Sequence, residues 1–263
     1  MRRRAGAAPS RDASARDASA RDAPARDAPA LAAPALAAPA LVALALVAPV
    51  RAGRADAPLA AGLAAAYAAF ALTFRGPRRS FWQRMTTTGL VLGGLALAAE
   101  PELRRIRFGR AEVAAGLGSA AGLYGVFLVG DRLARRLLPK GAQEIGDIYA
   151  LRHLRPGPEL TARLGLVIGP AEELFWRGFV NERLGRHWGR WPGAALGAAA
   201  YGGAHVATGN FTLLGAAGVA GTYWSALAAA GMPMGALVVS HVAWDLWTFL
   251  AAPTSEASDQ QRS

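Results

Sequence analysis

The sequence RLGLVIGPAEELFWRGFV, residues 163–180, is nearly long and apolar enough to cross a membrane, yet it carries two adjacent carboxylates at its centre. A membrane helix needs about 20 mostly apolar residues. An acidic side chain at the bilayer centre costs about 2.5–3.5 kcal/mol, so it is kept where it faces a cavity, pairs with another group or performs a function. Glu172 and Glu173 therefore indicate a membrane helix whose carboxylates face a cavity, pair with another group or perform a function.

Other apolar segments of similar length lie on both sides of this one in the sequence. They are residues 57–74, 85–99, 113–130, 193–208, 211–231 and 233–252. The chain is 53% hydrophobic, and such runs are typical of membrane proteins rather than of soluble domains. We therefore expect an all-α, polytopic membrane bundle of about seven spans, with the catalytic bundle formed by the last four.

Positive charge is concentrated between the apolar segments. The net charge is +11, and arginines cluster within residues 75–84, 104–110 and 132–140. Loops that flank membrane helices carry such charges, which set topology and contact anionic lipid. We therefore expect membrane lipid as a partner and no nucleic acid, in a multi-pass protein of a bacterial plasma membrane. The side with residues 75–84 and 132–155 is predicted to face the cytoplasm.

The chain falls into four predicted regions. Residues 1–50 form a low-complexity tail or targeting segment, because residues 11–30 repeat RDASA and RDAPA and contain nothing that forms a core. Residues 51–158 hold the first spans and their connections, residues 159–252 the catalytic bundle, and residues 253–263 a polar tail. For residues 31–50 a span, a cleaved signal and a tail all remain open. The chain has no cysteine, which excludes disulfides, a thiol nucleophile and a thiolate zinc site.

The first candidate site is the acidic pair itself. Glu173 and Arg177 are four residues apart and share one helix face, in the favourable order with the acid first. We predict that Arg177 neutralises and orients Glu173 and leaves Glu172 free to act. An ordinary surface ion pair is the simpler interpretation, but the apolar flanks argue against it.

Two further segments place ionisable groups inside apolar helices. His205 ends the sequence YGGAH, and a single histidine of this kind is more often a core residue than a ligand. His241 and Asp245 are four apart, so they can act as a ligand pair or as a base with its orienting partner. Two imidazoles and two or three carboxylates are what is needed to activate a water, by general base catalysis or on a metal. A divalent ion such as zinc would be held by Glu172, His205, His241 and Asp245.

The order E-E-x-x-x-R, aromatic-x-x-x-H and H-x-x-x-D/N over residues 160–250 resembles the CPBP intramembrane proteases. This family, also called Abi or CAAX proteases, includes the type II CAAX prenyl endopeptidases. Tyr201 departs from the usual phenylalanine and adds a hydroxyl. Asp245 stands where the eukaryotic prenyl proteases have asparagine, which favours cation binding and weakens the transfer of a prenyl-CAAX substrate to this chain.

The resemblance implies hydrolysis of a peptide bond in a membrane-associated or prenylated-type peptide or protein substrate. It assigns catalytic roles to Glu172, Glu173, Arg177, His205, His241 and Asp245. Glu172 with His205 would activate the water, Glu173 with Arg177 would hold the first helix, and His241 with Asp245 would stabilise the oxyanion or complete a metal site. Two alternatives remain open: a non-catalytic membrane scaffold or immunity protein, and an ion-coupled transporter that uses the same buried groups.

Overall fold

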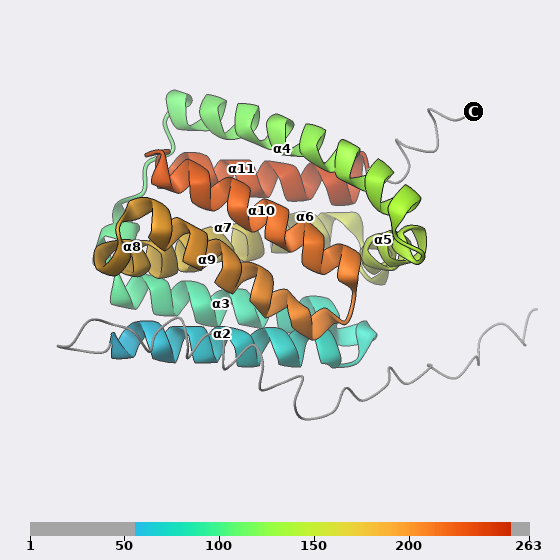
Figure 1. Cartoon of the computed structure of the whole chain (residues 1–263), viewed down its shortest axis with the longest axis horizontal. Helices are drawn as coiled ribbons and strands as arrows, with labels where there is room; N and C mark the ends of the chain where they lie inside the picture. Colours follow the sequence, from blue (N-terminus) through green and yellow to red (C-terminus); the bar gives the residue numbers. More distant parts are fainter. Residues whose placement is uncertain (1–55, 254–263) are drawn as a thin grey trace, which may run out of the picture. The chain divides into compact units, whose positions relative to one another are not determined.

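The computed structural model describes residues 56–253, and each described element is helical (Figure 1). The first elements are α2 (Ala57–Arg75), η1 (Arg78–Ser80), α3 (Phe81–Ala99), η2 (Pro101–Arg105), α4 (Arg110–Leu137), α5 (Gly141–Tyr149) and η3 (Ala150–Leu154). The predictions for the N-terminal repeat, for residues 31–50 and for most of the C-terminal tail lie outside the described residues.

The motif-bearing region begins with one continuous helical run. It consists of α6 (Gly157–Arg163), η4 (Leu164–Ile168), α7 (Gly169–Glu173), η5 (Leu174–Asn181) and α8 (Glu182–Trp188). Then follow α9 (Arg190–Ala204), η6 (His205–Thr208), α10 (Phe211–Ala229), α11 (Met234–Leu246) and η7 (Trp247–Ala251). The predicted apolar segments are thus all helical.

Within residues 56–253, four helices are long and apolar enough to cross a membrane. They are Ala57–Arg75, Arg110–Leu137, Phe211–Ala229 and Met234–Ala251. The predicted count of about seven spans is therefore not confirmed. One reason is length, because α9 has 15 residues and a bilayer crossing needs about 17–25. Another is charge, because the run that contains α7 carries Glu172, Glu173 and Arg177 within it.

The helices before the motifs pack directly on the helices that carry them. The larger core joins Phe70 of α2 to Phe175, Trp176 and Phe179 of η5, all of them fully buried. A second core lies between α4, α10 and α11, and α4 packs mainly along α11. From α7, which lies next to the first of these cores, Glu172 contacts Tyr201 of α9 and Glu173 contacts His241 of α11.

The backbone around α7 is not a regular α-helix. η4 and η5, which precede and follow it, are π-helical, and the amide of Gly169 bonds to the carbonyl of Leu164, five residues back. Pro170 comes next and has no amide hydrogen to continue a regular ladder. On the other side, Gly93 of α3 lies so close to Ala171 that a Cβ there would sit 3.0 Å from the alanine methyl. The helix is therefore held tightly against α3 on the side of Ala171.

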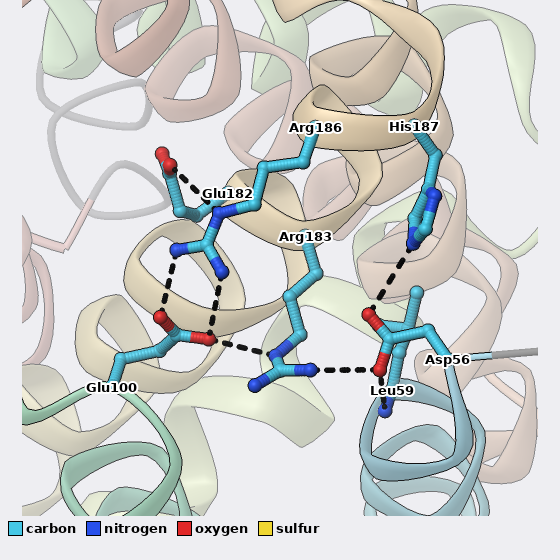
Figure 2. Close-up of polar contacts among 7 residues, drawn as sticks. All are labelled: Asp56, Leu59, Glu100, Glu182, Arg183, Arg186 and His187. Atoms are coloured by element: carbon cyan, nitrogen blue, oxygen red, sulfur yellow. Dashed lines mark hydrogen bonds and ion pairs between the residues drawn. The ribbon is translucent and has the colours of Figure 1, made fainter. Parts of the chain in front are cut away.

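The helix ends near Asp56 are joined by ion pairs (Figure 2). Arg183 of α8 bonds to Asp56, the N-cap of α2, and to Glu100 at the end of α3, both at 2.7 Å. Arg186 contacts the other oxygen of Glu100 at 2.8 Å. We call this set the helix-end ion cluster: Asp56, Glu100, Glu182, Arg183, Arg186 and His187. It connects α8 to both α2 and α3.

Candidate active site

Glu173 lies at the centre of a fully buried ionic group. Nη1 of Arg177 donates to Oε1 of Glu173 at 2.9 Å, and neither side chain is exposed to solvent (0% for both). The predicted pairing of these two residues is thus confirmed. Nδ1 of His241 donates to the same oxygen at 2.7 Å. The pair that was predicted to orient one helix also reaches across to α11.

The guanidinium of Arg177 lies against two aromatic rings. Its central carbon is 4.8 Å from the ring centre of Tyr201 on α9 and 5.3 Å from that of Trp224 on α10. Nη2 also donates to the carbonyl of Gly221 at 3.3 Å. A buried cation needs such partners, because desolvation is costly and aromatic faces attract positive charge. Arg177 therefore joins α7 and η5 to both α9 and α10.

Glu172 points to a different partner from its neighbour. The hydroxyl of Tyr201 donates to Oε2 of Glu172 at 3.0 Å. Nδ1 of His205 donates to the backbone carbonyl of Tyr201 at 2.9 Å. Because a carbonyl oxygen can only accept, a neutral His205 carries its proton on Nδ1 and keeps a lone pair on Nε2. Tyr201 therefore contacts both residues that were predicted to activate a water.

His205 is surrounded by aromatic rings. The ring centres of Phe70 and Phe74 on α2 lie 5.2 and 5.7 Å from it, and that of Tyr201 lies at 4.8 Å. The two phenylalanines come from a helix that precedes every motif, and sequence reasoning missed them. The signal that was available is their spacing of four residues on one apolar helix.

His241 is held on several sides. Its Nε2 lies 3.8 Å from Oδ2 of Asp245 on the next turn of α11, as the shared helix face predicted. The indole of Trp224 stacks on its imidazole, with ring centres 4.0 Å apart and planes inclined by 16°. Trp224 was also missed, because nothing in the Ala- and Gly-rich sequence of α10 indicates which way its tryptophan faces.

The six predicted catalytic residues form one connected group. Glu173, Arg177, His241 and Asp245 make one set of contacts, and Glu172, Tyr201 and His205 make another. The two sets meet where Arg177 lies over Tyr201. Such a group offers a carboxylate with a fixed hydrogen bond, an imidazole lone pair and buried positive charge, which together can activate a water and stabilise an oxyanion.

The two histidines have the orientation of metal ligands, but the predicted ligand set is not gathered around one point. Both histidines donate from Nδ1 to an oxygen, an arrangement that leaves Nε2 for a ligand. Within residues 56–253, however, no group of three or more His, Asp and Glu side chains is placed so that it could hold a metal ion. The four residues predicted as ligands are thus not gathered into a ready metal site in this conformation.

Residues 158–247 match the model of the family described as Type II CAAX prenyl endopeptidase Rce1-like. The matched range contains every residue of the three motifs, so the resemblance drawn from them is confirmed for this segment. Together with the four apolar helices, it indicates an integral membrane protein with a protease-type segment. No curated protein and no solved structure matches the chain. The helices α2, α3 and α4 lie outside the matched range.

Proposed function

We propose that the chain is an intramembrane endopeptidase that hydrolyses a peptide bond in a membrane-associated or prenylated-type substrate. The proposal rests above all on one observation. The carboxylate of Glu172, held by Tyr201, belongs to the same buried group as His205, Arg177 and His241. That group lies inside the segment that matches the endopeptidase family.

In the proposed reaction Glu172 is the general base. It takes a proton from a water whose oxygen forms a bond to the carbonyl carbon of the substrate. The proton then passes to the amide nitrogen, the carbon–nitrogen bond breaks, and an acid and an amine are released. His205 takes part through the lone pair of Nε2, which can hold the water or carry the proton.

The remaining groups stabilise charge and geometry. His241, when protonated, stabilises the oxyanion that develops on the carbonyl oxygen, and Asp245 supports its charge from the next turn. Glu173 and Arg177 hold the helices together rather than react, since they form an ion pair that is shielded from solvent. A protonated His241 is stabilised by its short contact with Glu173.

The test is a cleavage assay in detergent or liposomes with a fluorogenic membrane peptide, prenylated and unprenylated. Glu172→Gln should lower turnover by about 10²–10⁴-fold, the usual contribution of a general base, with little change in melting temperature. Glu102→Gln, at an exposed acid of η2, is the matched control. Full activity of Glu172→Gln would overturn the mechanism, and a wild-type protein without cleavage of either peptide would overturn the function.

A metal-assisted variant of this function is tested separately. A divalent ion such as zinc would polarise the carbonyl or supply a hydroxide, and Glu172, His205, His241 and Asp245 would have to move together to bind it. Exhaustive chelation followed by zinc addition, with activity, melting temperature and elemental analysis as readouts, decides the point. Loss and recovery of both activity and melting temperature would establish the metal, since ligand binding adds to the stability of the folded state.

A further inference from the structure

Trp224 makes a contact with His241 that no motif accounts for. Its indole and the imidazole are nearly parallel, at 16°, with ring centres 4.0 Å apart. Both side chains are buried, and Trp224 is completely so. The tryptophan comes from α10 and the histidine from α11, so the stack sets how these two helices meet at the site.

The indole itself is fixed by hydrogen bonds. Nε1 of Trp224 donates to Oγ of Ser240 at 3.0 Å, and Oγ of Ser240 donates to Oγ of Ser119 at 2.9 Å. Ser240 directly precedes His241, and Ser119 lies on α4, outside the segment that matches the family. The hydroxyl of Tyr223, next to Trp224 on α10, donates to the backbone carbonyl of Ser119 at 2.9 Å and so adds a second link between α10 and α4. The plane of the indole is therefore tied to both α4 and α11.

The contacts of the His241 imidazole depend on the orientation of its ring. Nδ1 of His241 donates to Glu173, while Nε2 faces Asp245 at 3.8 Å, beyond a direct hydrogen bond. A rotation of the ring about its bond to Cβ would break the first contact and turn the second nitrogen away. A parallel indole resists that rotation, because a tilted imidazole would collide with it. The stack also favours a protonated imidazole, since aromatic faces attract positive charge.

We propose that Trp224 is a positioning residue for His241. It keeps the imidazole in the plane where Nδ1 donates to Glu173 and Nε2 faces Asp245, and it is itself held there through Ser240 and Ser119. The geometric part of this inference is independent of the reaction, and its effect on turnover rests on the proposed function.

The experiment compares Trp224→Leu, Trp224→Phe and, as a matched control at an exposed tryptophan of α9, Trp191→Leu. Trp224→Leu should lower kcat by about 100-fold with KM nearly unchanged, the size expected when a reacting group is misplaced by about 1 Å. Trp224→Phe keeps an aromatic face and should recover most of that loss. Trp191→Leu should behave as the wild type.

A second readout is the nuclear magnetic resonance spectrum of protein with isotope-labelled histidine. The chain has four histidines, and His241→Asn identifies the signals of His241. Trp224→Leu should shift these signals strongly, because the ring current of the indole is lost, and Trp224→Phe should shift them less. His241 signals that do not move in Trp224→Leu would overturn the inference, as would equal kcat values in a cleaving enzyme. Shifted signals in a protein that cleaves nothing would overturn the proposed function alone.

Discussion

The site around Glu173 and the helix-end ion cluster use the same residue types in different surroundings. At the site, Arg177 and Glu173 are both fully buried. In the helix-end ion cluster, the side chain of Arg186 is 51% exposed although its partner Glu100 is nearly covered. An exposed ion pair contributes about 0.2–1 kcal/mol, whereas breaking a buried one costs about 3–5 kcal/mol. The loss of an arginine–glutamate ion pair is therefore expected to lower the stability of the fold more at the site than in the helix-end ion cluster.

The two regions also differ in what lies beside the charges. The guanidinium of Arg177 meets two aromatic rings that each touch a predicted catalytic residue. The charges of the helix-end ion cluster mainly meet one another, and they connect the ends of α2 and α3 to α8. Buried charge held by aromatic groups suits chemistry, while charges that share partners at helix ends suit attachment of one helix to another.

Removal of Arg177 is the largest expected effect on stability. Arg177→Ala leaves Glu173 buried without its cation and should cost about 3–5 kcal/mol, seen as a large fall in melting temperature or yield in detergent. Arg186→Ala, at the half-exposed arginine, should cost about 1 kcal/mol or less. Equal losses in the two variants would show that burial is not what separates the two regions. A well-folded Arg177→Ala protein that loses only turnover would show that the arginine acts in the reaction.

A methyl group at Gly221 should be the next largest effect. Its Cβ would lie 2.8 Å from a ring carbon of Tyr201, and its carbonyl already accepts from Arg177. Gly221→Ala should therefore push Tyr201 away from Glu172, with a loss of about 1–3 kcal/mol from overpacking and a loss of turnover. Gly215→Ala on the same helix, where a Cβ meets nothing within 4 Å, is the control and should be neutral or slightly stabilising. Two indistinguishable variants would mean that the close approach of α9 and α10 is not needed.

Loss of the Tyr201 hydroxyl should have a smaller effect on stability. Tyr201→Phe removes the donor to Glu172 and should cost about 0.5–1.5 kcal/mol, with lower turnover because the base is no longer held. Tyr124→Phe removes a hydroxyl that donates to the carbonyl of Ala252, away from the site, and should leave turnover unchanged. Unaltered turnover in Tyr201→Phe would show that the hydroxyl does not orient the carboxylate.

Contacts within one helix were predictable from the sequence, and contacts between helices were not. Glu173 with Arg177, and His241 with Asp245, follow from a spacing of four residues, which helix geometry fixes. The stack of Trp224 on His241 depends on the rotation and depth of two helices. Those are set by packing details such as the glycine at 221, whose role emerges only when the neighbouring ring is known.

The positions of the helices were predictable from runs of apolar residues, but the number of membrane crossings was not. Runs of apolar residues mark helices well, and each predicted segment is helical. Whether a helix crosses depends on its length and on the charges it buries. α9 ends after 15 residues because the chain tightens into η6 at His205, a change that composition does not reveal.

The smallest expected effect is the response of the helix-end ion cluster to acid. Burial raises the pKa of Asp56, but the hydrogen bonds from Leu59 and Arg183 and the charge of Arg183 outweigh it, so the pKa is held below its ordinary value of 3.8. An acid with a lowered pKa stabilises the fold above that ordinary value, and the contribution disappears as the pH falls through the folded-state pKa. The wild type should therefore lose melting temperature below about pH 4, and Asp56→Asn should lose less over the same range. Glu102→Gln, at an exposed acid, is the control and should follow the wild type. Identical acid curves for Asp56→Asn and wild type would show that the ionised carboxylate of Asp56 adds nothing to the stability of the bundle. The ion pairs that connect α8 to α2 would then contribute nothing measurable, in contrast to the buried pair at the site.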